Sequence, residues 1–169
     1  GQPLAVRRRP LSAMRLALPQ TVVLDALEPA VAAAFSRALT RLSAAGAQLV
    51  EIPLHELAEI PRLNAPGGLS PVEAFAAHGA RLARDRQAFD PRVAARIALG
   101  EPVTAQQYIA MHDQRAAWIA RVERELAGFD ALLCPTVPLL APAIDPLVAS
   151  DEAFFAANGL LLRNPATIN

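Results

Sequence analysis

The sequence predicts an α/β fold that is rich in helix, with a mixed sheet of few strands, a βαβ unit and covering helices. Three observations predict it. Alanine, the best helix former, is the commonest of the 169 residues. Capping signals mark the starts of several helices, and short apolar runs bounded by proline or glycine mark strands between them. A chain of this length normally makes one domain with one core.

The first elements along the chain form a βαβ unit. One strand is expected over Met14–Pro19 and a second over Gln48–Ile52, which Pro53 ends. Between them lies a helix with Pro29 in its first turn, where the missing N–H costs nothing, and Gly46 at its end. Strand, helix and strand at this spacing imply a parallel pair with a right-handed crossover.

Three helices are expected in the middle of the chain. Ser70–Glu73 is a capping box that predicts a helix over 71–88, and Asp90 opens a short helix. Thr104–Gln107 is a second capping box, which opens the longest helix, over 105–127. The core-facing positions of this longest helix are expected to be Ile109, Ala116, Ile119, Val122 and Leu126.

The last part of the chain combines a short strand, a proline-rich loop and a final helix. The strand is expected over Asp130–Cys134, and the helix begins at Ser150. The chain ends at Asn169 without a polar tail or a cap, which natural domains seldom do. We therefore expect the sequence to be part of a longer domain. Its uncovered apolar face and unpaired strand edges predict either self-association or disordered segments near 1–12 and 135–150.

The composition excludes several classes of function. With 16 basic and 16 acidic side chains the chain is neutral, whereas nucleic acid binding needs a basic face. No apolar run is long enough to cross a bilayer. The single cysteine excludes a disulfide framework and a cysteine-rich metal site, and it fits a reducing, cytoplasmic compartment. We therefore expect no nucleic acid, membrane, metal or cofactor as a partner.

Few side chains are candidates for catalysis or binding. All 16 basic residues are arginine, so chemistry that needs a lysine cannot be completed within this chain. Cys134 ends a strand, where α/β proteins place active residues, but a small buried side chain is the simpler interpretation. The three histidines have no metal-ligand spacing. Arg92 and Arg96 lie four apart and could hold an anion together, although a solvated basic face is the commoner outcome.

Several segments, taken in order, resemble the C-terminal half of amidase signature enzymes. They are the strand Met14–Pro19, the start of a helix at Leu27–Val31, the segment Ala45–Glu51, the run Asp90–Gly100, and Phe129–Pro138 followed by Arg163–Asn169. The most specific piece is Asp-x-Leu-Leu-x-Pro-Thr within Phe129–Pro138. The resemblance covers essentially the whole chain and divides it into a linker, residues 1–12, and the C-terminal part of an amidase domain, residues 13–169.

The resemblance implies a hydrolase that cleaves the carbon–nitrogen bond of a small carboxamide. In that family a serine nucleophile is activated by a second serine in a cis peptide bond and by a lysine, beside a Gly/Ser-rich signature. None of this can be carried over, because the chain has no lysine and its serines match no part of the motif: Ser12, Ser36, Ser43, Ser70 and Ser150. The triad is therefore expected to lie outside this chain, which alone should be inactive. The sequence does not decide whether the parent enzyme is a homo-oligomer.

One pocket residue can be assigned by similarity. In the glutamine-dependent amidotransferase A subunits, an arginine of the Arg-Ile-x-x-Gly segment contacts the substrate carboxylate, and that position matches Arg96. Those subunits carry an aspartate where this chain has Leu162, which favours a general amidase. Two alternatives stay open: part of a tRNA-dependent amidotransferase A subunit, and an α/β module that binds a partner without catalysis.

Overall fold

The computed structural model describes residues 9–168 of the chain, which divide into two compact units. The sheet unit consists of the described residues of Gly1–His55 and Glu125–Asn169. The helical unit is Glu56–Arg124. No helix in the described part of the chain is both long enough and apolar enough to span a bilayer.

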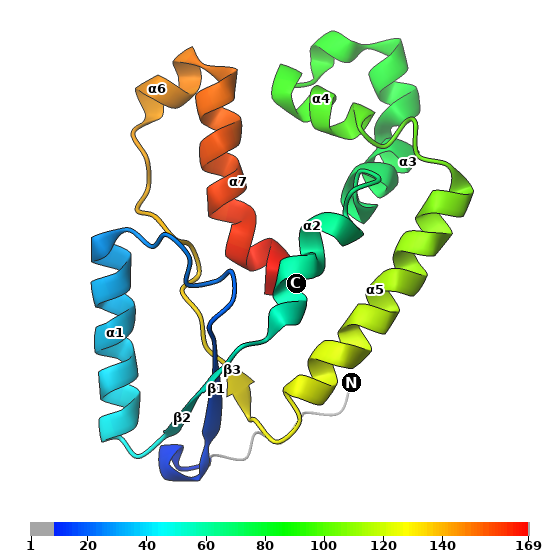
Figure 1. Ribbon diagram of the computed structural model, residues 1–169. Coiled ribbons are helices and arrows are strands. Elements are labelled where there is room, and N and C mark those ends of the chain that lie inside the picture. The colour runs from blue at the N-terminus through cyan, green and yellow to red at the C-terminus, as the bar shows by residue number, and fades with distance from the viewer. Residues whose placement is uncertain (1–8, 169) are drawn as a thin grey trace, which may run out of the picture. The chain divides into compact units, whose positions relative to one another are not determined.

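The sheet unit contains a three-stranded sheet in the order β2-β1-β3 (Figure 1). The central strand β1 (Arg15–Pro19) pairs in parallel with β2 (Gln48–Ile52), so that Arg15 lies opposite Gln48. Helix α1 (Pro29–Ala44) connects these two strands and contacts β2, which confirms the expected βαβ unit. On the other side of β1 lies β3 (Ala131–Leu132), which is also parallel to it.

The α/β fold class is confirmed, with one correction. The sheet was expected to be mixed, but all the strand pairs within residues 9–168 are parallel. Parallel neighbours need a crossover connection, and each strand here is reached through helices. The chain passes through α1 between β1 and β2, and through the whole helical unit between β2 and β3.

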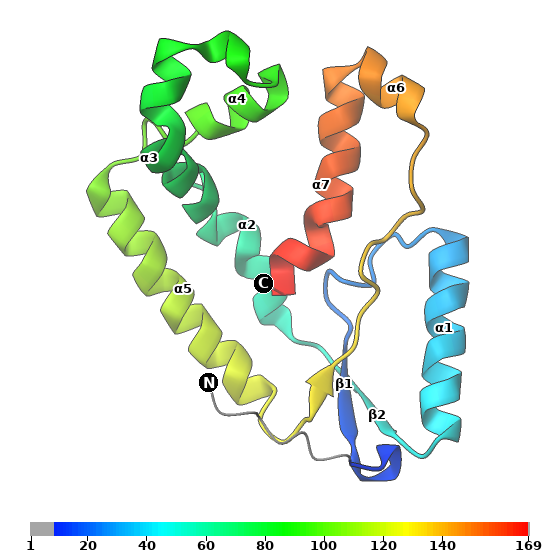
Figure 2. The same cartoon turned by 180° about the vertical axis from the view of Figure 1, so that it is seen from behind.

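Strand β1 is the buried centre of the sheet unit. Leu16, Ala17 and Leu18 are all buried, so both faces of the strand are covered. This agrees with the apolar composition of a central parallel strand, which is shielded from water on its two faces. The remaining helices of this unit are α6 (Ile144–Ala149) and α7 (Asp151–Ile168), which contact each other and lie side by side in both views (Figure 2).

A 3-10 turn, His55–Glu59, spans the boundary at which the helical unit begins, and the short helix α2 (Ile60–Leu63) follows it. Helices α3 (Leu69–Arg84) and α4 (Pro91–Ala98) then pack against each other. Their shared core consists of buried and partly buried apolar side chains: Leu82, Ala94, Ile97, Ala74, Phe75, Phe89 and Ala98. This core explains why two short amphipathic helices hold together.

Local capping signals predicted two of the three middle helices well. The Asp90 carboxylate accepts hydrogen bonds from the N–H groups of Arg92 and Val93, at 2.9 and 3.2 Å, and so caps α4. The Thr104 hydroxyl accepts from the N–H of Gln107, whose side chain accepts from the N–H of Thr104. This reciprocal pair is the expected capping box, and α5 (Ala105–Glu125) follows it.

The third capping signal was wrong. Helix α3 begins one residue before Ser70, and no side chain caps it. Gly68, with a φ of 80°, turns the chain into the helix instead, a conformation that a residue with a side chain rarely adopts. The helix also ends at Arg84 rather than 88, because the Asp85 carboxylate accepts a hydrogen bond from the N–H of Ala88 and starts a 3-10 turn, Arg86–Ala88.

The buried face of α5 agrees with the expected one only in part, since Ile119 and Val122 are half-buried. Met111 and Trp118 are its buried residues, whereas Ile109 is 60% exposed and Ala116 is exposed. The Trp118 indole N–H donates to the carbonyl oxygen of Glu56 at 2.8 Å. Because this buried donor needs an acceptor, it selects the face of α5 that packs on the start of the helical unit.

Gly100 lets the chain after α4 approach the first turn of α3. A methyl group at Gly100 would lie 2.2 Å from the carbonyl oxygen of Pro71 and 2.8 Å from the Cα of Val72. Both atoms belong to the backbone, so they cannot rotate away. Gly159 in α7 is a matched contrast, because nothing lies within 4 Å of its added methyl group.

We expect Gly100→Ala to lower the free energy of unfolding by about 1–3 kcal/mol, since it forces α3 and α4 apart. Gly159→Ala should be neutral or raise it by up to about 1 kcal/mol, because alanine favours the helix. Urea unfolding followed by circular dichroism measures both. Equal stability of Gly100→Ala and the wild type would contradict the close approach of these two segments.

Candidate functional site

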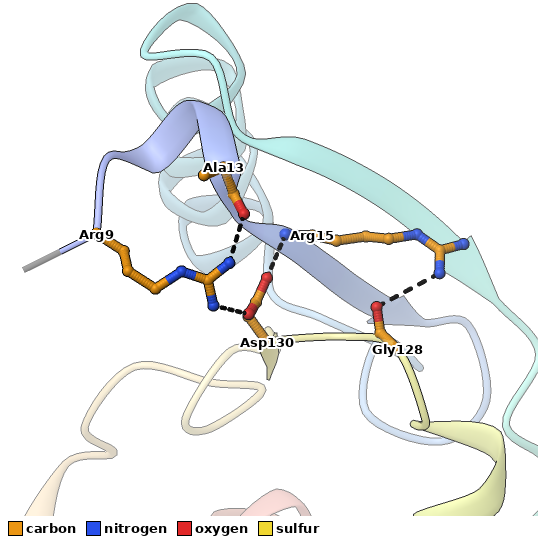
Figure 3. Close-up of polar contacts among 5 residues, drawn as sticks. All are labelled: Arg9, Ala13, Arg15, Gly128 and Asp130. Atoms are coloured by element: carbon orange, nitrogen blue, oxygen red, sulfur yellow. Dashed lines mark hydrogen bonds and ion pairs between the residues drawn. The ribbon is translucent and has the colours of Figure 1, made fainter. Parts of the chain in front are cut away.

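The first residue of the Asp-x-Leu-Leu-x-Pro-Thr motif fixes β3 against β1 (Figure 3). The Asp130 carboxylate accepts a hydrogen bond from the N–H of Arg15 at 2.8 Å, and the N–H of Asp130 donates to the carbonyl oxygen of Arg15 at 2.8 Å. The other carboxylate oxygen pairs with the guanidinium of Arg9. Asp130 therefore holds the start of β3 in register with the start of β1.

Arg15 extends this contact to the residues before the motif. Its guanidinium lies over the ring of Phe129, 4.3 Å from the ring centroid, and donates to the carbonyl oxygen of Gly128 at 3.5 Å. The start of the motif is therefore a structural anchor. Of the expected linker, residues 1–8 lie outside the described part of the chain, and Arg9 contacts Asp130.

The opposite ends of the same two strands meet at a single buried side chain. Asn164 of α7 is 1% exposed, and its amide nitrogen donates to the carbonyl oxygens of Val23 at 2.9 Å and Pro135 at 2.8 Å. Val23 follows β1 and Pro135 follows β3. One amide thus ties the last helix to the carboxyl ends of two strands, which is the edge where open α/β sheets bind ligands.

Arg163 lies beside this amide. Its Nε donates to the side-chain oxygen of Asn164 at 3.0 Å. Its Nη2 is buried and has no hydrogen-bond acceptor within residues 9–168. Together with Val23, Cys134 and Pro135, these two residues make the carboxyl-edge site, which is the candidate functional site of the sheet unit.

Cys134 is half-buried at this edge and is not in a disulfide. Burial raises the pKa of its thiol above the ordinary value. Since the thiolate is the reactive form, a raised pKa disfavours nucleophilic chemistry at neutral pH. The structure therefore favours the packing interpretation of this residue over the nucleophilic one.

Arg96, the expected pocket residue, lies in α4 of the helical unit and is exposed. Its assignment to a substrate carboxylate stays a prediction. Arg92 on the same helix is half-buried. Within the described residues no group of three or more His, Cys, Asp or Glu side chains could hold a metal ion.

Sequence reasoning missed the roles of Arg163 and Asn164. Both stand inside a segment that carries the family resemblance, Arg163–Asn169, and that was the available signal. A second signal was the position of these two polar side chains, which directly follow the apolar run Leu160–Leu162 in the last helix. Asn169 itself lies outside the described residues.

A family model described as Amidase matches residues 5–165 of the chain. The chain belongs to the amidase family. It is 30% identical over 156 residues to the 2-amino-5-chloromuconic acid deaminase of Comamonas testosteroni, which covers 92% of the chain and 34% of the deaminase. It is 27% identical over 128 residues to an amidase of Pseudomonas putida, covering 76% of the chain and 27% of that amidase.

Solved structures agree with this membership of the amidase family. The crystal structure of an amidase superposes with a TM-score of 0.69 at 28% identity, over 78% of this chain and 30% of that one. The S177A allophanate hydrolase of Kluyveromyces lactis superposes with a TM-score of 0.75 at 21% identity, over 92% of this chain and 26% of that one. The chain thus spans about a third or less of the amidase-family proteins that it matches.

Removal of the Asn164 amide should strongly destabilise the sheet unit of this amidase-family chain. Asn164→Leu keeps the size of the side chain but leaves the carbonyls of Val23 and Pro135 without their donor. We expect a loss of about 2–4 kcal/mol in the free energy of unfolding. Asn158→Leu, a half-buried position on the same helix, should change it by less than about 1 kcal/mol. Urea unfolding measures both, and similar losses for the two variants would refute the role of Asn164.

The Asp130 anchor should make stability depend on pH. The N–H of Arg15 and the guanidinium of Arg9 hold the pKa of Asp130 below its ordinary value of 3.8. A carboxyl group whose pKa falls on folding stabilises the fold above the unfolded pKa and loses this effect as pH falls through the folded pKa.

We therefore expect Asp130→Asn to lower Tm at pH 7, and the difference from the wild type to shrink below about pH 4. Asp25→Asn, at an exposed position of the same unit, is the control and should leave Tm unchanged. Thermal melts across this pH range provide the measurement. A difference in Tm that stays constant down to pH 2 or grows on acidification would rule out the carboxylate as the source.

Proposed function

We propose that this chain is the pocket-shaping, C-terminal part of an amide hydrolase of the amidase family. The match to the amidase family over residues 5–165 carries the proposal. The two curated relatives support it, since one is named an amidase and the other a deaminase, and both names specify the removal of nitrogen from carbon. The small parallel sheet and its helices, which resemble the corresponding part of a solved amidase, also support it.

The catalytic groups of the proposed enzyme lie outside this chain. By family resemblance they are a serine nucleophile, a second serine in a cis peptide bond and a lysine. The chain contains no lysine, and its five serines are isolated from one another. Without a nucleophile and its base there is nothing to acylate, so the 169 residues alone do not hydrolyse amides. The chain contributes part of the substrate-binding surface, and the residues that break the amide bond lie in another part of the proposed enzyme.

The substrate of the proposed enzyme is a small amide, and Arg96 is its proposed carboxylate contact. An arginine suits this role because its charge persists at every physiological pH and its donors match the two carboxylate oxygens. The names of two similar proteins support an acidic substrate, because one specifies 2-amino-5-chloromuconic acid and the other specifies allophanate. An exposed position on α4 leaves the Arg96 guanidinium available for such a contact.

The proposal is tested by comparing the 169-residue chain with the product of its complete reading frame. The intact mass of each preparation is measured first, since a mass above 17.9 kDa means that further residues are present. Both are then assayed for ammonia release from a panel of neutral and carboxylate-bearing carboxamides. We expect activity in the longer protein and none in the 169-residue chain.

Replacement of the signature lysine in the longer protein should reduce kcat by several orders of magnitude, because it removes the base that activates the serine. Its control is a conservative change of a lysine outside the signature. If the longer protein releases no ammonia from any of the carboxamides, the proposed hydrolase function is wrong. If the isolated 169-residue chain is active, the placement of the triad outside it is wrong.

A further inference from the structure

Some charged side chains of the described residues form ion pairs with an opposite charge, and others do not. Glu59 pairs with Arg62 at 2.8 Å and with Arg121 at 2.6 Å, and Asp130 pairs with Arg9. Arg163 forms no such ion pair with a carboxylate of the described residues of the sheet unit. The only hydrogen bond that its guanidinium makes to the described residues goes from Nε to the neutral side chain of Asn164.

The position of this guanidinium is fixed by its neighbour. Asn164 is buried, and it uses its two amide protons on the carbonyls of Val23 and Pro135. Its side-chain oxygen accepts a hydrogen bond from the Nε of Arg163, so each polar atom of the amide side chain has a partner. Arg163 is therefore oriented at Nε by a rigid buried group, while Nη2 is withdrawn from water and lacks an acceptor among the described residues.

A buried donor of this kind is unfavourable unless an acceptor reaches it. A guanidinium nitrogen that is withdrawn from water without a partner loses its hydration and gains nothing in return. Because the group is charged and planar, the acceptor that compensates it best is an anion with two oxygens, such as a carboxylate. The side-chain oxygen of Asn164 accepts from Nε and not from Nη2, and because it is neutral it does not neutralise the guanidinium.

We propose that Arg163 binds a carboxylate of the substrate at the carboxyl-edge site of the sheet unit. This inference rests on the proposed function and narrows its substrate class to amides that carry a carboxylate. The site lies where β1 and β3 end, which is the edge at which α/β sheets take ligands. The acidic substrates specified by the names of the deaminase and the allophanate hydrolase agree with the same class.

Binding to the longer protein, made inactive by replacement of its signature lysine, tests the inference without turnover. The probes are succinamate, an amide with a carboxylate, and succinamide, its neutral diamide counterpart. This inactive protein is labelled with ¹⁵N, and the arginine Nε–H signal that is lost in Arg163→Gln is assigned to Arg163. We expect succinamate to shift this signal with a saturable dependence on its concentration, and succinamide to leave it unchanged.

The variants give the expected size of the effect. Arg163→Gln should weaken the binding of succinamate about 10- to 100-fold, because a charge-assisted hydrogen bond to a buried group is lost. Arg37→Gln, which removes an exposed arginine of α1 in the same sheet unit, should bind succinamate like the inactive protein without this change. If Arg163→Gln does not fold, the signal in the inactive protein that retains Arg163 decides the matter alone, with its assignment made by through-bond correlation to the backbone.

Three results would overturn the inference. The Arg163 signal does not respond to succinamate, or it responds equally to succinamide, or Arg163→Gln binds succinamate as tightly as the inactive protein that retains Arg163. A silent signal would mean that the acceptor of Arg163 belongs to the polypeptide rather than to a ligand. The proposed hydrolase function fails by a different result, the absence of ammonia release from the longer protein, so the two failures are distinguishable.

Discussion

The sheet unit depends on polar side chains at the two ends of its shortest strand. Strand β3 has two residues, so its ladder of hydrogen bonds with β1 is too short to hold it alone. The Asp130 carboxylate holds the amino end through the backbone of Arg15, and the Asn164 amide holds the carboxyl end through Pro135. Because Asn164 also binds the carbonyl after β1, both ends of the β1–β3 pair are fixed by side chains.

This arrangement explains why the Asp-x-Leu-Leu-x-Pro-Thr motif has a charged first residue and a proline after its apolar centre. The aspartate replaces the missing length of strand with charge-assisted bonds, which are stronger than neutral ones. Pro135 follows the strand, which ends at Leu132, and its carbonyl oxygen accepts a hydrogen bond from the buried amide of Asn164. The motif thus positions the carboxyl-edge site, and the catalytic chemistry of the amidase family does not reside in its side chains.

The features that could be predicted from the sequence are those decided by neighbours along the chain. Asp90 and Thr104 act as caps because their partners lie two or three residues away. The βαβ unit could be predicted because a parallel pair joined by one helix has a characteristic spacing. Ser70 failed as a cap because Gly68, two residues earlier, already turned the chain. The buried face of α5 could not be predicted, since the acceptor of the Trp118 indole lies 62 residues away.

The carboxyl-edge site could not be predicted either, because its contacts join residues that are far apart in the sequence. The partners of Asn164 lie 141 and 29 residues away along the chain, and no local pattern encodes such contacts. A buried amide that donates twice leaves only its oxygen for a neighbour, and Arg163 occupies that oxygen through Nε. The consequence is a guanidinium that is oriented but not neutralised by the described residues. The chain has 16 acidic side chains and 16 arginines. The guanidinium of Arg163 therefore lacks a carboxylate partner among the described residues of its unit because of its position, and not because carboxylates are scarce.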